Sequence, residues 1–214
     1  MPFNRFLFFS VALAASIGNG QAVAQVNQQY AACTHSIATN PEAAYKKARA
    51  WYGTSKTLAA QHCMALALYE MKDFNGASNA LETILRGMTP SQGQLWLSMK
   101  LQTSKAHYAA GNFGAAKKHL DDSIYWATDR AVDEEIVPFL LQRAKVFIKQ
   151  AQHLKAVQDY DHAISIAPSV QSHLLRAKLL ISMGKHAQAQ EDIDAILESD
   201  PGNIAAKNLL KNIR

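Results

Sequence analysis

The feature that most constrains this chain is a pair of helix-like segments within residues 140–168. Apolar and small residues recur there at helical spacing, at Leu140, Ala144, Phe147 and Ile148. A short break at residues 151–153 precedes a second run with the same spacing, at Ala156, Tyr160, Ala163 and Ile164. Pro168 ends this second run, because proline cannot continue a helix. Together these residues predict two amphipathic helices that fold back on each other as a hairpin.

The same pattern occurs at other places in the chain. Downstream, Ala177 corresponds to Ala144, and the step from Pro168 to Pro201 is 33 residues. Upstream, Ser104 and Ala65 hold the same place in two more hairpins. One amphipathic hairpin cannot bury its apolar face alone, so successive hairpins are expected to stack. Strand-like runs of Val, Ile and Thr are absent from the sequence, which favours an all-α chain.

The order of a small residue, an aromatic residue, a turn, a second small residue and a proline resembles the tetratricopeptide repeat, which has a period of about 34 residues. This resemblance implies an all-α, right-handed α-solenoid of antiparallel helix pairs. About four repeats are expected, with N-terminal helices before them and a C-terminal capping helix after them. The predicted segments are a helical lead-in with Cys33 (residues 25–54), repeats at 55–87, 91–128, 133–168 and 169–201, and a capping helix at 203–214.

Residues 1–24 have the pattern of a secretory signal peptide. Arg5 provides a basic start, residues 6–17 are apolar, and Ala22-Val23-Ala24 is a small-residue cleavage site before Gln25. The apolar run is shorter than the roughly 20 residues of a membrane-spanning helix, so no stable span is expected. An uncleaved anchor and a lipid anchor are alternatives. We expect cleavage near Ala24-Gln25 and a periplasmic or secreted mature chain.

Two cysteines, Cys33 and Cys63, lie near the expected mature N-terminus. In an oxidising compartment such a pair favours a disulfide, which would attach the lead-in helix to the first repeat. Two free buried thiols are an alternative. A metal site is another, since His35 and His62 lie beside these cysteines, but adjacent His62 and Cys63 point in different directions on a helix.

The residues that follow Cys33 carry a second resemblance. A cysteine, an Asn-Pro step, an alanine-rich helix with a tryptophan and a His-Cys step before a repeat resemble the N-terminal module of exported bacterial tetratricopeptide proteins. Asn40 is expected to cap the helix that Pro41 begins, and residues 53–55 are expected to form the turn after it. This resemblance implies a bacterial, periplasmic protein and no assigned biochemical activity.

Motifs that indicate catalysis are absent from the sequence. It contains no Gly-rich phosphate loop, nucleophile elbow, His-Glu-x-x-His sequence or paired carboxylates, so we expect a protein that is not an enzyme and holds no cofactor or metal. His153 and His186 fall in equivalent turns, where a flat side chain wedged between helices is the expected role. Binding to nucleic acid is not expected, because it requires a larger basic patch with interleaved aromatic residues.

The best indication of function is a row of lysines. Lys105, Lys145 and Lys178 each follow the small residue at which the helices of their repeats cross. In tetratricopeptide repeats this place faces the concave groove, and carboxylate-binding members usually have Asn there. Three lysines predict a basic groove for an anionic partner.

We therefore expect a periplasmic protein-interaction scaffold or assembly factor whose partner in the cell envelope has acidic segments. The alternative is a non-enzymatic binder of an anionic envelope polymer or small ligand, related to the cell wall or lipopolysaccharide. The sequence gives no oligomeric state.

Overall fold

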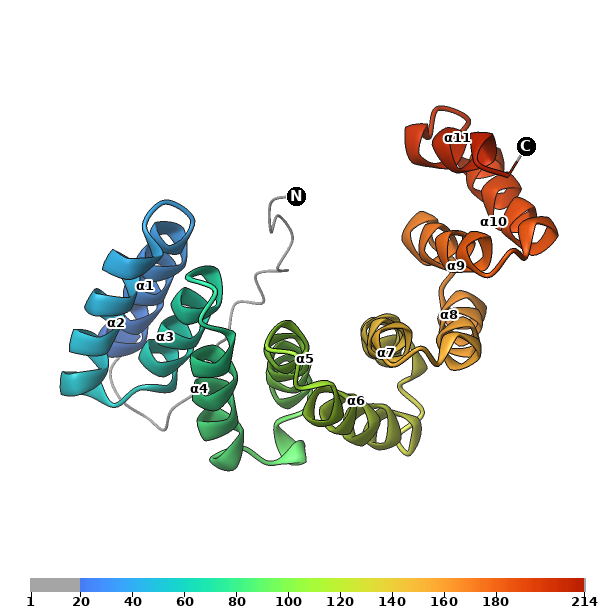
Figure 1. Cartoon of the computed structure of the whole chain (residues 1–214). Coiled ribbons are helices and arrows are strands. Elements are labelled where there is room, and N and C mark those ends of the chain that lie inside the picture. Colours follow the sequence, from blue (N-terminus) through green and yellow to red (C-terminus); the bar gives the residue numbers. More distant parts are fainter. Residues whose placement is uncertain (1–19, 214) are drawn as a thin grey trace. The chain divides into compact units, whose positions relative to one another are not determined.

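The computed structural model describes residues 20–213, which form two compact units, residues 20–96 and 97–213. These residues contain eleven α-helices, two short 3-10 helices and no strand (Figure 1). The all-α fold predicted from the sequence is confirmed. Most of the predicted signal peptide, residues 1–19, lies outside the described residues, and residues 20–24 begin the first helix. Between residues 20 and 213, no helix is both long enough and apolar enough to cross a bilayer.

The first unit is built from four helices in which each packs on the next in chain order. The first helix, α1, also packs against α3. A 3-10 turn, η1 (Pro90–Gln92), follows the fourth helix. The four helices are α1 (Gly20–Ile37), α2 (Pro41–Ser55), α3 (Leu58–Glu70) and α4 (Phe74–Arg86).

The ends of α2 confirm one expectation and correct another. The Asn40 side chain accepts a hydrogen bond from the Ala43 amide at 2.9 Å, which caps the helix as predicted. The expected turn at residues 53–55 is wrong, because these residues are the last turn of α2. The Thr54 and Ser55 hydroxyls donate to the Trp51 carbonyl, so their polar groups are satisfied within the helix.

The second unit begins inside the first turn of α5 (Gln94–Ala109) and continues through six further helices. Figure 1 shows α7 to α11 following one another in chain order. Consecutive helices from α6 to α11 pack against each other. These helices are α6 (Phe113–Thr128), α7 (Val137–Lys149), α8 (His153–Ile166), α9 (Val170–Ser182), α10 (His186–Ser199) and α11 (Ile204–Lys211).

A 3-10 helix, η2 (Asp133–Ile136), precedes α7. Its first three residues, Asp133, Glu134 and Glu135, are acidic. Val137, the residue before Pro138, has helical φ and ψ of −52° and −48°. The backbone therefore continues from the 3-10 turn directly into α7.

The hairpins α3–α4, α5–α6, α7–α8 and α9–α10 turn in the same way. One residue in each turn has a positive φ: Lys72, Gly111, Ala151 and Gly184, at 63°, 81°, 56° and 72°. The next amide donates to the carbonyl five residues earlier, as in Asn112 to His107 at 2.8 Å and Gln152 to Phe147 at 2.8 Å. This is the Schellman motif, which satisfies the last carbonyls of a helix. Because the turns match, residues of the four hairpins can be compared one to one.

Small residues allow the two helices of each hairpin to approach closely. The predicted crossing residues Ala65, Ser104, Ala144 and Ala177 are fully buried. In the third hairpin, Tyr160 packs with Ala144, Phe147 and Ala156, as the sequence indicated. At the C-terminus, the Asn203 side chain accepts from the Ala206 amide at 3.0 Å and caps α11.

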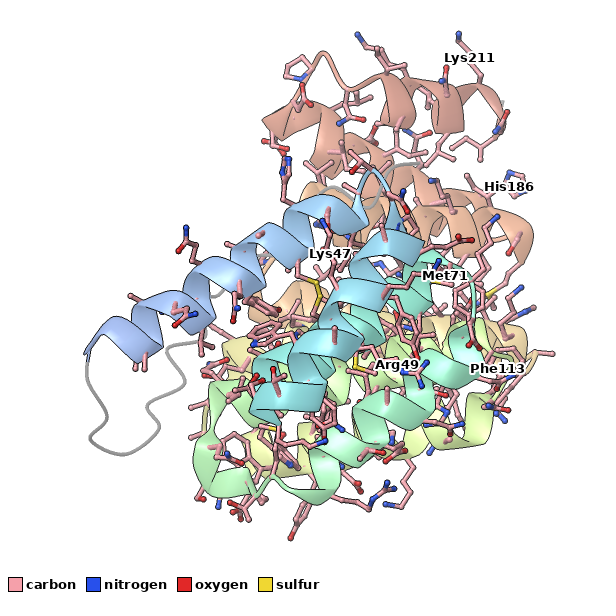
Figure 2. The ribbon with its side chains drawn as sticks, turned by 90° about the vertical axis from the view of Figure 1, so that its left-hand side faces the viewer. Lys47, Arg49, Met71, Phe113, His186 and Lys211 are labelled. Atoms are coloured by element: carbon pink, nitrogen blue, oxygen red, sulfur yellow. A yellow bond between two sulfur atoms is a disulfide. The ribbon has the colours of Figure 1, made fainter. Side chains whose placement is uncertain are left out.

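Two histidines are more exposed than the sequence suggested. His153 and His186 are the first residues of α8 and α10, and both are exposed rather than wedged between helices. Figure 2 shows His186 pointing away from its helix. Tyr125 is 77% exposed, whereas its neighbour Trp126 packs with residues of α7 and η2. The Schellman turns explain why the two histidines are exposed. The residue with positive φ lies two positions before each histidine, so each histidine begins the next helix at the edge of the turn.

Candidate functional site

The three predicted groove lysines come from the first helices of three hairpins in the second unit. Lys105 lies on α5, Lys145 on α7 and Lys178 on α9. Each lysine follows a fully buried crossing residue, so the turn of the helix places the lysine on the face beside the buried one. The matched turns give the three lysines the same register in their hairpins.

Lys105 and Lys145 lie close enough for their charges to interact. Both side chains are half-buried. Burial lowers the pKa of the Lys105 ammonium, and the positive charge of Lys145 lowers it further. Burial also lowers the pKa of Lys145. Two ammonium groups are thus held near one another in a partly desolvated place, where an anion would be favourable.

Lys178 differs from the other two lysines, because its side chain is exposed. It keeps its register in α9, one residue after Ala177, but solvent surrounds its side chain. The structure therefore brings two of the three predicted residues together, and the binding role of all three stays a prediction. An exposed lysine contributes mainly to the long-range field of the surface.

A repeated ion-pair network, not predicted from the sequence, lies beside these lysines. The Arg143 guanidinium donates two hydrogen bonds to the Asp159 carboxylate, from Nε at 3.0 Å and from Nη2 at 2.7 Å. Its Nη1 also donates to Asp121 of the preceding hairpin at 2.9 Å. One arginine thus joins α7 to both α8 and α6, in the bidentate geometry that guanidinium groups favour.

The next hairpin repeats this arrangement. Arg176 donates to Asp192 at 3.0 Å and 2.7 Å, and its Nη1 donates to Asp161 of the preceding hairpin at 2.6 Å. His173 Nδ1 lies 2.7 Å from the same Asp192 carboxylate, which is fully buried. The pairs link α9 to α10 and to α8. They fix the register of neighbouring hairpins.

A signal for this network is present in the sequence. Arg-Ala-Lys occurs at residues 143–145 and again at 176–178, and an aspartate follows the second-helix alanine by three residues in both hairpins. Both the arginine and the aspartate recur after 33 residues, which indicates that the two form a charge pair in each repeat. The basic residue just before the crossing alanine is structural, and the one just after it is the candidate for binding.

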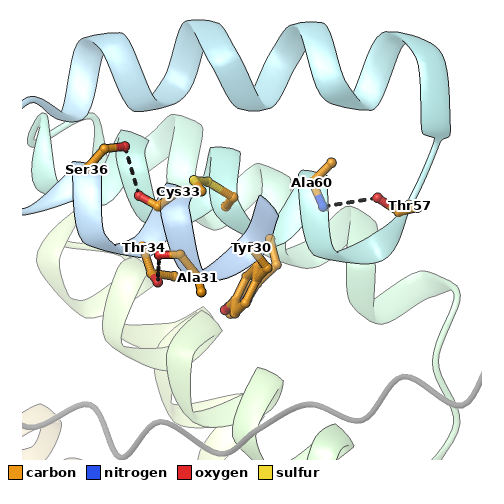
Figure 3. Close-up of a disulfide and its surroundings, with 9 residues drawn as sticks. Tyr30, Ala31, Cys33, Thr34, Ser36, Thr57 and Ala60 are labelled. Carbon is orange, nitrogen blue, oxygen red and sulfur yellow. Dashed lines mark hydrogen bonds between the residues drawn. A yellow bond between two sulfur atoms is a disulfide. The ribbon is translucent and has the colours of Figure 1, made fainter. Parts of the chain in front are cut away.

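The predicted cysteine pair lies in the first unit and forms a disulfide between Cys33 of α1 and Cys63 of α3 (Figure 3). The two Cα atoms are 6.4 Å apart, within the usual range for a disulfide. Beside it, the Tyr30 hydroxyl and His62 Nδ1 lie 2.7 Å apart, and the two rings stack. His62 is therefore engaged by Tyr30, and His35 is exposed.

Comparisons with known proteins agree with this architecture. A family model described as the tetratricopeptide repeat matches residues 137–169 and 170–203. No curated protein sequence matches the chain. MamA from Desulfovibrio magneticus RS-1 is structurally similar, with a TM-score of 0.66 and 12% identity over 85% of this chain and 96% of that chain.

Two other solved structures have similar folds. TTC0263, a thermophilic tetratricopeptide-repeat protein of Thermus thermophilus, has a TM-score of 0.62 and 17% identity over 88% of this chain and 98% of its own. The Rap conjugation gene regulator of plasmid pLS20, solved in complex with the Phr* peptide, has a TM-score of 0.59 and 14% identity over 94% of this chain and 68% of its own.

These findings identify the fold and two of its repeats. The chain has the all-α fold of tetratricopeptide-repeat proteins, and residues 137–203 hold two repeats of that family. Proteins of this class are generally scaffolds that present an extended surface to protein partners.

Proposed function

We propose that this chain is a non-enzymatic protein-interaction scaffold of the bacterial cell envelope. It binds an acidic segment of a partner protein along the first helices of the second unit. The periplasmic or secreted location rests on the signal-peptide pattern of residues 1–24. The binding face rests on Lys105, Lys145 and Lys178.

The observation that carries this proposal is the pair of half-buried lysines. Partial burial lowers the pKa of Lys105 and the charge of Lys145 lowers it further, so the pair is less stable when both are charged. A carboxylate of a partner favours the charged forms and relieves this repulsion. Binding of an anionic segment therefore stabilises the folded protein. The same repulsion makes the lysine face selective for anionic segments.

The three lysines act mainly through their combined field. The fields of lysines in neighbouring hairpins partly add where they lie within about one Debye length, which is about 8 Å at physiological salt. A single exposed contact contributes only about 0.2 to 1 kcal/mol. The expected signature is a fast, salt-sensitive association rather than a tight single contact.

A capture experiment from envelope extract tests the proposal. The bait is the mature chain, and the variant carries Lys105→Glu, Lys145→Glu and Lys178→Glu. A second variant with the three lysines changed to Met removes the charge without reversing it. The matched control reverses three exposed lysines of the same unit, Lys185, Lys207 and Lys211, and so has the same net charge as the Glu variant.

The wild type and the matched control should capture the same protein partner, and both groove variants should lose it. Circular dichroism should show that all four proteins keep their helical content. Equal capture by the groove variants would contradict the proposed binding face. Capture of a glycan or lipopolysaccharide fraction in place of a protein would replace the protein partner with an anionic polymer. N-terminal sequencing of the envelope protein should begin at Gln25, and recovery of Met1 would contradict the proposed processing.

A further inference from the structure

The hairpin formed by α5 and α6 contains a histidine pair that the basic groove does not use. His107 lies on α5 and His119 on α6, and their side chains are only 8% and 7% exposed. The imidazole rings are nearly parallel, with an interplanar angle of 10° and centroids 5.6 Å apart. A ring nitrogen of His107 and a ring nitrogen of His119 lie within 4.8 Å of each other.

The other hairpins show that the fold does not require histidine at these places. The matched turns align His107 with an apolar residue in each of the three other hairpins: Leu68, Phe147 and Leu180. They align His119 with Ala80, Asp159 and Asp192. An imidazole in a core position costs desolvation free energy that an apolar residue avoids. Two such replacements meet in one hairpin, which indicates a role beyond packing.

The ion-pair network also changes at this hairpin. In the next two hairpins, the residue aligned with His119 is an aspartate that pairs with an arginine of the first helix. Here the place of that arginine is taken by Thr103, whose hydroxyl donates to the Met99 carbonyl at 2.7 Å. Both members of the charge pair are therefore replaced. His119 takes the place of the aspartate, and histidine is the commonest metal ligand among side chains.

We propose that His107 and His119 ligate one divalent transition-metal ion, with Zn²⁺ as the favoured ion. Imidazole nitrogen is a preferred ligand of zinc, copper and nickel. Zinc–nitrogen bonds of about 2.0 to 2.1 Å place two ligand nitrogens of a tetrahedral site roughly 3.3 Å apart. The two imidazole rings must rotate out of their stacked arrangement to direct both nitrogens at one ion. Water or a further side chain completes the coordination.

The consequence of binding is local. The ion would join α5 to α6 within the hairpin, as Arg143 and Arg176 join the helices of the next two hairpins. Because imidazole must be neutral to bind a metal, affinity should fall as the pH is lowered. The site is independent of the proposed binding face, since Lys105 and Lys145 need no metal to attract an anion.

Isothermal titration of the tag-free mature chain with Zn²⁺ tests this proposal. The result expected is one zinc per chain, a rise in melting temperature, and reversal of that rise by a chelator. The test variants are His107→Leu and His119→Ala, which install the residues that the first hairpin has at these places and so suit the fold. Each should bind Zn²⁺ at least about tenfold more weakly.

Two controls distinguish this site from other histidines. His162→Ala removes an exposed imidazole of α8 and should bind zinc like the wild type. His35→Ala tests the neighbourhood of the disulfide and should also leave zinc binding unchanged. As a second readout, Cu²⁺ bound to the wild type should show two nitrogen ligands by electron paramagnetic resonance.

The proposal would be overturned by three results. The first is no zinc uptake by the wild type. The second is undiminished uptake by His107→Leu and His119→Ala. The third is a loss of binding in His35→Ala or His162→Ala alone, which would place the metal elsewhere.

Discussion

The two units of this protein hold their helices together in different ways. In residues 20–96, a disulfide joins α1 to α3, and small residues such as Ala44, Ala48 and Ala67 pack around it. In residues 97–213, Arg143 and Arg176 bridge three helices each, through a buried carboxylate (Asp159 or Asp192) and a more exposed one of the preceding hairpin. One unit uses a covalent link between distant helices, and the other uses repeated charge pairs between neighbouring helices.

The two kinds of link act in different ways. A disulfide limits the separation of its two helices in the unfolded chain as well as in the folded one, whatever packs around them. A hairpin that packs against a preceding hairpin can share one guanidinium between a carboxylate of its own and a carboxylate of that neighbour. The two units should therefore respond to different perturbations, and amide hydrogen exchange of peptides from each unit can measure them separately.

Removal of the disulfide should have the largest effect. Closure of a loop of about 30 residues stabilises a fold by about 3 to 4 kcal/mol. Cys33→Ala with Cys63→Ala should lower the stability of the first unit by about this amount and leave exchange in residues 97–213 unchanged. Thiol labelling of denatured, unreduced wild type should find no free cysteine. Two labelled thiols would contradict the disulfide.

Removal of an arginine should have the second-largest effect, confined to the second unit. Arg143→Met leaves the buried Asp159 carboxylate without its main partner and should cost about 3 kcal/mol in chemical unfolding. Arg176→Met should cost less, because His173 remains against Asp192. The double change Arg143→Met with Asp159→Leu is the control, and it should recover much of the loss. Equal costs for both arginine variants would show that His173 does not support Asp192.

A smaller effect is expected at alkaline pH in the first unit. Burial raises the pKa of the Tyr30 phenol from 10.0 to about 12. The folded unit therefore holds this proton more tightly than the unfolded chain does. Its stabilising contribution is full below about pH 10 and is lost as the pH rises toward 12. The loss should be about 2 kcal/mol and should be absent from Tyr30→Phe. The same loss in Tyr30→Phe would assign it to another group.

The smallest effect should be a gain in stability. Burial and the charge of Lys145 lower the pKa of Lys105, so the charged pair destabilises the second unit. The folded state binds these protons less tightly than the unfolded state, so stability should rise as the pH approaches the ordinary lysine pKa. Lys145→Met should stabilise the unit at neutral pH by at most about 1 kcal/mol, because water screens half-buried charges. Thermal unfolding measures this gain, and a decrease in stability would contradict the repulsion.

The hairpins and their crossing residues could be predicted from the sequence because they follow from local periodicity. Ala144, Ala177 and Tyr160 are buried where the spacing of small and aromatic residues places them. The end of α2 could not be predicted in this way. Gly, Thr and Ser suggest a turn by composition, but hydroxyl contacts with the Trp51 carbonyl keep that segment helical.

The candidate sites were harder to predict, because their residues meet only through packing. His107 and His119 lie on different helices, and no spacing rule for metal ligands connects them. The pairing of Arg143 with Asp159 was missed for the same reason, although its recurrence at Arg176 and Asp192 is visible in the sequence. The lysine register was predicted, whereas the unequal burial of Lys105 and Lys178 depends on neighbouring helices.

Binding of a labelled oligoglutamate peptide tests the central claim most directly. Fluorescence anisotropy would compare the wild type, the Glu variant at Lys105, Lys145 and Lys178, and the matched control at Lys185, Lys207 and Lys211. The account predicts that the wild type and the control bind with similar affinity, that added salt weakens both, and that the groove variant does not bind. Equal loss in the groove variant and the control would show that net charge alone attracts the peptide and would contradict a binding face on the first helices.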